Sequence, residues 1–161
     1  MTADYSEIAK DPASLKTPPN FADYSTLATG WTWEGVKSEL DLPGGSYNLA
    51  HECIDRHANG LLATKVAMIH EGQDGTVTNF TFADMQREAN RWANALASLG
   101  IRKADRIFFF TDRIPELYFA IFGTLKLGAI IAPLFSAFGP EPVAERIRRA
   151  EGVMVVTTPH L

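Results

Sequence analysis

The stretch that decides the fold runs from Arg106 to Leu161 and reads RIFFFTDRIPELYFAIFGTLKLGAIIAPLFSAFGPEPVAERIRRAEGVMVVTTPHL. Its apolar runs at residues 107–110, 130–134 and 153–156 alternate with two helical patterns at nearly even spacing. Strands that alternate with helices are typical of parallel βαβ units. We therefore predict an α/β fold with a partial parallel sheet built from βαβ units and flanked by helices.

Proline and glycine set the ends of the two helices in this stretch. Pro115 and Pro140 suit the first turn of a helix, and Gly128 and Gly152 suit the end of one. The run at 107–110 is apolar on both faces, as expected for a central parallel strand. In open parallel sheets, ligands bind beyond the carboxyl ends of the strands. The loops after the strands are therefore the first places to look for a site.

The residues before this stretch divide into two regions. Residues 1–48 are rich in proline and glycine, yet they also contain the aromatic residues Phe21, Tyr24, Trp31 and Trp33. We predict an irregular strap over the rest of the protein, with one short helix at 32–40 capped by Thr32. A disordered leader is the alternative, although low aromatic content is the usual mark of disorder.

Residues 49–161 are predicted to form the first part of a larger domain. Asn48 is expected to cap a helix over 49–57, and residues 66–70 and 77–80 are expected to pair as a β-hairpin. Thr81 and Asp84 have the spacing of a capping box, which predicts a helix that Gly100 ends.

Composition narrows the functional classes. The 161 residues include 46% hydrophobic and 21% charged residues, with a net charge of −4, which argues against a nucleic-acid or anionic-membrane partner. No apolar run reaches the ~18 residues of a membrane span. The single cysteine, Cys53, excludes an internal disulfide and fits a cytoplasmic location.

Two loops after predicted strands hold candidate residues. The loop Phe135-Ser-Ala-Phe-Gly139 precedes a helix whose backbone N–H groups favour an anion or nucleotide, and an ordinary packed loop is the alternative. Asp112 and Arg113 lie at the same place after the previous strand. We expect Asp112 to cap the following helix and to take part in a surface ion pair, and a place for Asp112 and Arg113 at the rim of a site is the alternative.

Two further clusters have simple interpretations. Cys53 and His57 are four residues apart on one predicted helix face, but a structural metal needs about four ligands. We therefore interpret them as a buried thiol and a histidine at a helix end. Glu145 and Arg149 are expected to pair in solvent, and a phosphate-binding role for the arginines of that helix is the alternative.

An ordered series of short motifs resembles the N-terminal part of the AMP-forming acetyl-CoA synthetases, in the adenylate-forming superfamily. The series comprises Asn48-Leu-Ala, Asp55-Arg-His57, Val66-Ala-Met-Ile-His70, Thr81-Phe-Ala-Asp-Met85, Ala93-Asn-Ala-Leu-Ala-Ser-Leu-Gly100, Asp105-Arg106, Ile114-Pro-Glu-Leu117, Leu127-Gly-Ala129, Pro133-Leu-Phe-Ser-Ala-Phe138 and Val155-Val-Thr-Thr-Pro159. The leader resembles theirs around Trp31-Thr-Trp33 and Leu42-Pro-Gly-Gly45. The resemblance covers about residues 20–161.

The resemblance implies a reaction and its cofactors. Such enzymes use ATP and Mg²⁺ to convert acetate to acetyl-adenylate and then transfer the acetyl group to coenzyme A (CoA). It also implies that the adenine end of CoA lies near Phe135, Ser136 and Ala137. Ser136 and Ala137 depart from the Phe-Gly-Gly version of this loop, which leaves less room for CoA or changes its pose slightly.

The resemblance assigns no catalytic residue and no metal ligand to this chain, because the family's phosphate loop and catalytic lysine lie downstream of Leu161. We therefore expect an inactive fragment that binds none of these cofactors tightly and self-associates through an exposed strand edge. Two alternatives remain open: another acyl- or aryl-CoA ligase of the same superfamily, and a non-catalytic module that binds a nucleotide or a partner.

Overall fold

The computed structural model describes residues 11–17, 23–40, 42 and 45–161. The chain forms two compact units, Met1–Leu40 and Asp41–Leu161. The sequence pattern places this division later, between Asn48 and Leu49. Phe21 of the predicted strap and the Pro43-Gly44 pair of the family resemblance lie outside the described residues.

The first unit contains a short 3₁₀ turn, η1 (Pro12–Ser14), and two helices, α1 (Tyr24–Gly30) and α2 (Trp33–Glu39). The predicted cap of α2 is confirmed, because the Thr32 hydroxyl accepts a hydrogen bond from the Gly35 N–H at 3.0 Å. Helix α1 was not predicted. Asp23 caps it, its carboxylate accepting from the N–H groups of Ser25 and Thr26.

The second unit opens with a helical segment over residues 49–58. Its middle part, η3 (His51–Asp55), is π-helical, and α3 (Arg56–Ala58) completes it. The prediction of a helix here is correct, but the sequence did not indicate the π-helical turns. Such segments are rare and interrupt the regular α-helical spacing.

Asn48 joins this segment to a second helix, α5 (Pro115–Lys126). Its side-chain oxygen caps the segment as predicted, accepting from the N–H groups of Ala50 at 3.0 Å and His51 at 3.2 Å. Its side-chain nitrogen donates to the carbonyl oxygens of Leu125 at 3.1 Å and Lys126 at 3.3 Å. One side chain therefore satisfies backbone groups at the start of one helix and the end of another.

The predicted hairpin is present. Strands β1 (Val66–Glu71) and β2 (Val77–Thr81) pair antiparallel, and Gly75 supplies a φ of 80° in the turn between them. Helix α4 (Phe82–Ser98) follows directly and has the predicted capping box. The Thr81 hydroxyl accepts from the Asp84 N–H at 3.1 Å, and the Asp84 carboxylate accepts from the Thr81 N–H at 3.0 Å.

The decisive stretch forms the predicted parallel sheet. Strand β3 (Arg106–Phe110) lies in the middle, with β4 (Ile130–Pro133) and β5 (Met154–Thr157) on either side. Both neighbours run parallel to β3. Helix α5 connects β3 to β4, and α6 (Pro140–Arg149) connects β4 to β5. The β-strands and helices of this stretch thus confirm the predicted α/β class.

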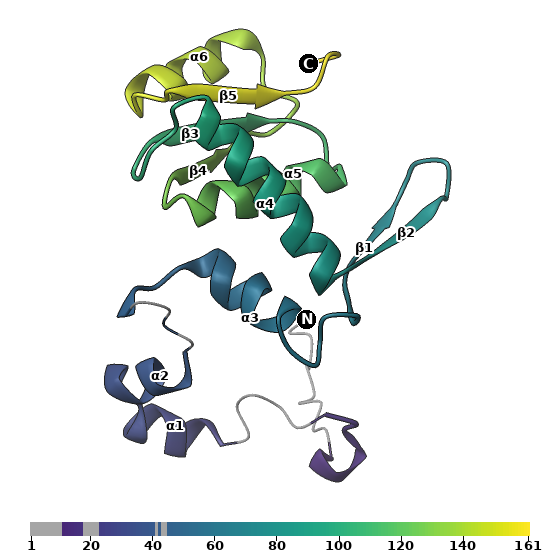
Figure 1. Ribbon diagram of the computed structural model, residues 1–161, viewed down its shortest axis with the longest axis vertical. Coiled ribbons are helices and arrows are strands. Elements are labelled where there is room, and N and C mark those ends of the chain that lie inside the picture. Colours follow the sequence, from purple (N-terminus) through teal and green to yellow (C-terminus); the bar gives the residue numbers. More distant parts are fainter. Residues whose placement is uncertain (1–10, 18–22, 41, 43–44) are drawn as a thin grey trace, which may run out of the picture. The chain divides into compact units, whose positions relative to one another are not determined.

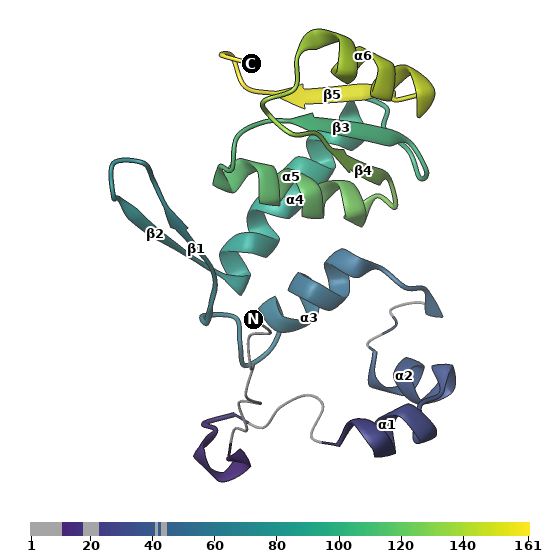
Figure 2. The ribbon, with the colours of Figure 1, turned by 180° about the vertical axis from the view of Figure 1, so that it is seen from behind.

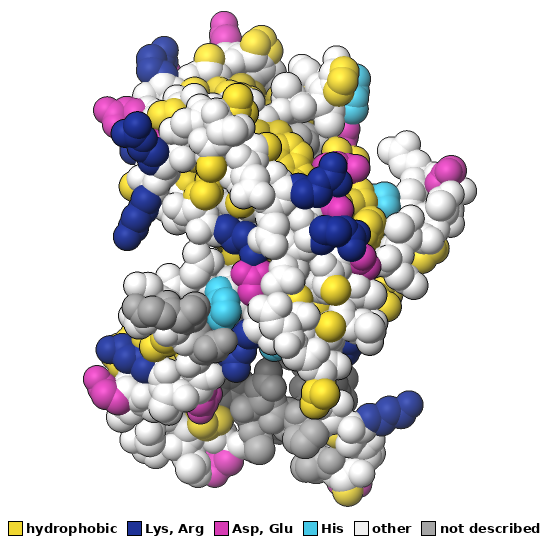
Figure 3. Space-filling model, in the orientation of Figure 1, with side chains coloured by type: hydrophobic (Ala, Val, Ile, Leu, Met, Phe, Trp, Pro, Cys, Tyr) yellow, Lys and Arg dark blue, Asp and Glu magenta, His cyan; other side chains and the backbone are white. Residues whose placement is uncertain are grey.

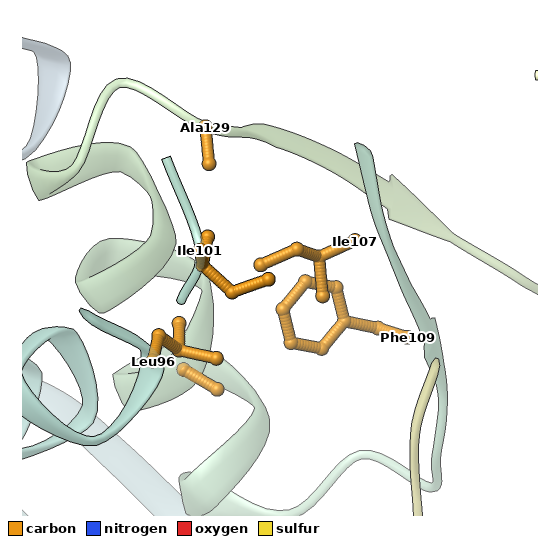
Figure 4. Packing of buried hydrophobic residues seen from close by; sticks show 6 residues of the cluster. Leu96, Ile101, Ile107, Phe109 and Ala129 are labelled. Atoms are coloured by element: carbon orange, nitrogen blue, oxygen red, sulfur yellow. The ribbon is translucent and has the colours of Figure 1, made fainter. Parts of the chain in front are cut away.

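Helices cover both faces of the sheet. Figures 1 and 2 show α4 and α5 together on one face and α6 on the other. Alternate β3 residues serve the two faces. Ile107 and Phe109 are buried in a cluster with Leu96 of α4 and Ile101, as Figure 4 shows. Phe108 packs against Gly152, where an added Cβ would lie 2.6 Å from the ring.

Charged side chains alternate in sign on the surface of α4. Figure 3 shows Lys and Arg side chains beside Asp and Glu side chains on this face. Arg87 pairs with Asp84 at 2.9 Å, and Arg91 pairs with Glu88 at 3.0 Å. Within the described part of the chain, no helix has the length and apolar character to cross a bilayer.

Candidate functional site at the carboxyl edge of the sheet

The β4–α6 loop (residues 134–139) lies at the carboxyl edge of the parallel sheet. Its first residue is tied to the central strand, because the Leu134 N–H donates to the Phe109 carbonyl at 2.8 Å. A tight turn follows, closed by a hydrogen bond from the Phe138 N–H to the Phe135 carbonyl at 3.0 Å. The predicted contact residues Ser136 and Ala137 are the two central residues of that turn.

This turn does not require glycine. Among the described non-glycine residues, only Ala104 and Glu151 have positive φ, so Ser136 and Ala137 both have negative φ. A turn with negative φ at both central positions is compatible with most residues. Serine and alanine therefore fit at these two positions without backbone strain.

Two aromatic rings and one cation form a row beside the loop. Phe135 is 64% exposed, and its ring centroid lies 5.7 Å from that of Phe138 at an interplanar angle of 85°. The Arg146 guanidinium lies over the other ring, 4.4 Å from the Phe138 centroid. Arg146 Nη1 also donates to the Pro142 carbonyl at 3.0 Å. An exposed aromatic ring is thus supported from behind by a second ring and a cation.

Phe138 also borders two grooves. One groove of ≈ 490 Å³ is lined by residues of β3, β5 and α6 together with Ser136 and His160. The other runs past Leu134, Arg146 and Arg149. Phe138 therefore lines two grooves, and most of the residues that line each groove are apolar.

Asp112 does not cap α5, contrary to the prediction. The N-cap residue is Ile114, which makes no side-chain capping hydrogen bond. The Asp112 carboxylate instead lies 2.5 Å from His160 Nε2, across the carboxyl ends of β3 and β5. Local sequence patterns do not predict this pair, because the two residues are 48 positions apart.

Two threonines at the same edge have unused hydrogen-bonding capacity. Thr111 and Thr158 directly follow Phe110 of β3 and Thr157 of β5, which are in register with each other. Both hydroxyl oxygens are buried, and neither has a hydrogen-bond partner among the described residues. Buried polar groups are normally satisfied. This edge therefore differs from the well-satisfied interior of the sheet.

The remaining candidates have structural surroundings. The Cys53 thiol is exposed, so the predicted burial is wrong, and it borders a cavity of ≈ 650 Å³ between η3, β1 and α4. The centroid of the His57 ring lies 5.0 Å from the centroid of the Phe82 ring. The predicted Glu145–Arg149 pair is confirmed, and Arg148 also pairs with Glu145. No group of three or more His, Cys, Asp or Glu side chains in the described ranges could hold a metal ion.

The sequence predicts this loop as a candidate contact but does not indicate the side chains that support it. The row Phe135–Phe138–Arg146 depends on a ring and a guanidinium that come together only when α6 packs beside the loop. The eight-residue spacing of Phe138 and Arg146 carries no helical signal, because the first residue precedes the helix. The loop thus presents an exposed aromatic ring with a second ring and a cation behind it.

The architecture is that of an α/β protein whose parallel strands present candidate ligand loops at their carboxyl edge. Residues 54–161 match the sequence model of the AMP-binding enzyme family. Because this match covers most of the chain, the protein belongs to that family.

Similarity to individual proteins agrees with this assignment. The chain is 43% identical over 144 residues to an acetyl-coenzyme A synthetase of Bacillus subtilis, covering 88% of this chain and 25% of that relative. It is 39% identical over 114 residues to a 3-hydroxypropionyl-coenzyme A synthetase of Metallosphaera sedula, covering 71% of this chain and 17% of that relative.

A solved structure supports the same fold. The crystal structure of an acyl-CoA synthetase of Brucella canis superimposes with a TM-score of 0.68 at 30% identity, covering 80% of this chain and 25% of that one. The chain therefore spans about a quarter or less of the length of the relatives it matches.

Proposed function

We propose that this chain is the first part of an AMP-forming acyl-CoA synthetase that acts on a short carboxylate such as acetate. The observation that carries the proposal is the 43% identity to an acetyl-coenzyme A synthetase over 88% of this chain. Since the chain covers only 25% of that relative, the activity is proposed for a longer protein that contains it.

The proposed reaction has two steps. A carboxylate oxygen attacks the α-phosphate of ATP, so that a new P–O bond forms and pyrophosphate leaves. The sulfur of CoA then attacks the acyl carbon, the bond to AMP breaks, and the thiol proton passes to solvent. ATP, Mg²⁺ and CoA are the proposed cofactors. The described residues do not provide a cluster that fits Mg²⁺.

We propose Phe135, Ser136 and Ala137 as contacts for the adenine end of CoA. Three features support this assignment: the exposed Phe135 ring, the tight turn at Ser136 and Ala137, and the position of the loop at the carboxyl edge of the sheet. Aromatic side chains stack on bases with about 1–3 kcal/mol per base. The exposed ring is therefore the natural contact for a purine.

The chain by itself is proposed to be catalytically inert and to bind these cofactors weakly. Stabilisation of charge on a transferred phosphoryl group needs preorganised donors or cations around it. The candidate site described above offers an aromatic platform and one cation rather than a cradle of that kind. A binding module without catalysis remains the alternative for a protein that consists of this chain alone.

The acid substrate has a second candidate. The 3-hydroxypropionyl-coenzyme A synthetase relative supports a hydroxylated three-carbon acid instead of acetate. A medium-chain acyl or aryl acid is a third possibility from the same superfamily.

Two properties of the chain complete the proposal. Among the described residues, strand β5 pairs with β3 on one side only, and Val155 is 42% exposed, so we propose that the isolated chain self-associates at this strand. Light scattering at increasing concentration tests this, and a monomer at all concentrations would contradict it. We also propose a cytoplasmic location, where ATP and CoA are available and the free Cys53 thiol stays reduced.

Thioester formation by the intact protein tests the proposed function. The protein is supplied with ATP, Mg²⁺, CoA and one acid from a panel of acetate, propionate, 3-hydroxypropionate, octanoate and benzoate. We expect the highest kcat/KM with acetate. A preference for 3-hydroxypropionate would select the second candidate, and absence of thioester with every acid would refute the synthetase proposal.

A further inference from the structure

Arg146 of α6 differs from the neighbouring arginines in its ionic contacts. Arg148 and Arg149 both pair with Glu145, and Arg106 of β3 pairs with Glu151. Arg146 has no carboxylate partner among the described residues. Its contacts are the Pro142 carbonyl, 3.0 Å from Nη1, and the Phe138 ring, 4.4 Å from the guanidinium carbon.

These two contacts fix the guanidinium over one ring of the loop. Pro142 lies one helical turn before Arg146, so the hydrogen bond holds the side chain along α6. A cation over the face of an aromatic ring is attracted by the negative charge of that face. Phe138 therefore has a fixed neighbour on one side.

The fixed ring in turn supports Phe135. The two rings meet edge to face, with centroids 5.7 Å apart, which is a favourable aromatic geometry. Phe135 has little other support, since its side chain is 64% exposed. Phe138 therefore contacts Phe135 on one side and Arg146 on another.

We infer that Arg146 is a positioning residue for CoA: its cation–π contact with Phe138 holds the Phe135 ring in the orientation that stacks on the adenine. This inference rests on the proposed function. Arg146 acts through the two rings, and it does not contact the acyl group, the thiol or the α-phosphate.

The test compares two half-reactions of the intact protein in variants Arg146→Met, Arg146→Lys and Phe135→Ala. Methionine keeps the apolar packing and removes the charge, whereas lysine keeps the charge and loses the planar stacking. Arg148→Met is the matched control, because Arg148 lies on the same helix and pairs with Glu145. Acetate-dependent ATP–pyrophosphate exchange reports the step that needs no CoA.

We expect Arg146→Met to raise the KM for CoA about two- to five-fold, the effect of one exposed cation–π contact. Arg146→Lys should lie between Arg146→Met and the unchanged protein, and Arg148→Met should have no effect. The exchange rate should stay the same in all of them. Dephospho-CoA should show the same ratio as CoA, because the stacked adenine is common to both.

A double-mutant cycle tests whether Arg146 changes the KM for CoA through Phe135. If Arg146 acts through Phe135, Arg146→Met has no further effect on the KM for CoA in the Phe135→Ala background. Additive effects would overturn the inference. A KM increase that is specific to CoA over dephospho-CoA would also overturn it, because Arg146 would then hold the 3′-phosphate itself.

Two further outcomes are distinguishable. Loss of pyrophosphate exchange together with CoA use in Arg146→Met would mean a general structural role and would overturn the inference. If the protein without any substitution has no CoA-dependent activity, the proposed function is refuted instead. In that case, nuclear Overhauser contacts between the labelled Phe135 and Phe138 rings still test whether Arg146 holds these rings together. We expect the contacts to be lost in Arg146→Met and retained in Arg146→Lys.

Discussion

Lys126 Nζ lies 2.5 Å from both carboxylate oxygens of Asp55, although the two residues are 71 positions apart. Their side chains are only 13% and 16% exposed. The pair joins the end of α5 to η3, beside the hydrogen bonds that Asn48 makes to the same end of α5. A charge pair and an amide thus hold the helical segment at 49–58 against the βαβ layer.

Replacing one member of this pair should destabilise the protein strongly. Asp55→Asn leaves the Lys126 ammonium buried without a counter-charge, so we expect a loss of about 2–3 kcal/mol in the free energy of unfolding, slightly below the effect at fully buried pairs. Urea denaturation measures it. The double variant Asp55→Leu/Lys126→Met should recover much of the loss. Equal stability of Asp55→Asn and the unchanged protein would contradict this account.

Helices α4 and α5 cross at Gly123. A Cβ added there would lie 2.7 Å from Trp92 Cβ and 2.9 Å from both the Ala89 carbonyl oxygen and the Ala93 nitrogen. Because two of these are backbone atoms, Gly123→Ala must separate the helices. We expect a loss of about 1–3 kcal/mol in the free energy of unfolding, as for other overpacked cores.

Gly60→Ala is the matched control for this substitution. An added Cβ at Gly60 would meet no atom closer than the Arg56 carbonyl at 3.4 Å, and its φ is not positive. Its stability should change by about 0.5 kcal/mol or less. If both alanine variants unfold at the same urea concentration as the unchanged protein, the close helix crossing at Gly123 is wrong.

The capping box of α4 predicts a specific acid dependence. Hydrogen bonds from the Thr81 hydroxyl and then the Thr81 N–H, with a smaller contribution from Arg87, lower the pKa of Asp84 from 3.8 to about 2. Since the folded pKa is below the unfolded one, ionised Asp84 stabilises the fold above about pH 4. This contribution is lost as the pH falls from about 4 to 2.

Two variants test this dependence. The stability difference between the unchanged protein and Asp84→Asn should be constant above about pH 4 and shrink toward pH 2. Thr81→Val removes the main cause of the shift and should raise the pKa of Asp84 in an NMR titration of its carboxyl carbon. An Asp84 pKa that does not change in Thr81→Val would refute the assigned cause.

The sequence predicted the local features of this fold well. Each βαβ element, the hairpin and the caps at Thr32, Asn48 and Thr81 depend on neighbouring residues, and all are present. Helix α1 was missed although Asp23 is a clear capping residue, whereas α2, which has the same length, was predicted from its cap Thr32. The π-helical turns of η3 likewise have no distinctive sequence pattern.

Features that depend on distant residues were less predictable. The position of Asp112 in the chain predicts a helix cap, yet its carboxylate interacts with His160, which is 48 positions away. Cys53 was expected to be buried because free cysteines usually are. Phe138 and Arg146 meet only after α6 packs beside the β4–α6 loop. For Asp112, and for Phe138 with Arg146, a tertiary contact decides the arrangement rather than the local sequence preference.

The proposed CoA contact at Phe135 makes a prediction for the intact protein. Phe135→Ala removes the exposed ring, so the KM for CoA should rise about 5- to 100-fold, in line with the stacking energy of one base on an aromatic side chain. The rate of acetate-dependent pyrophosphate exchange should not change. Tyr118→Ala is the control, because Tyr118 borders the separate cavity beside η3. An unchanged KM for CoA in Phe135→Ala would exclude this loop as the adenine contact.

The most direct test of the synthetase assignment is acetate-dependent exchange of radiolabelled pyrophosphate into ATP. We predict rapid exchange by the intact protein that contains this chain, and none by the 161-residue chain alone. Exchange by the isolated chain would contradict the claim that it is inert. Absence of exchange by the intact, folded protein with acetate and every other acid of the panel would contradict the assignment itself.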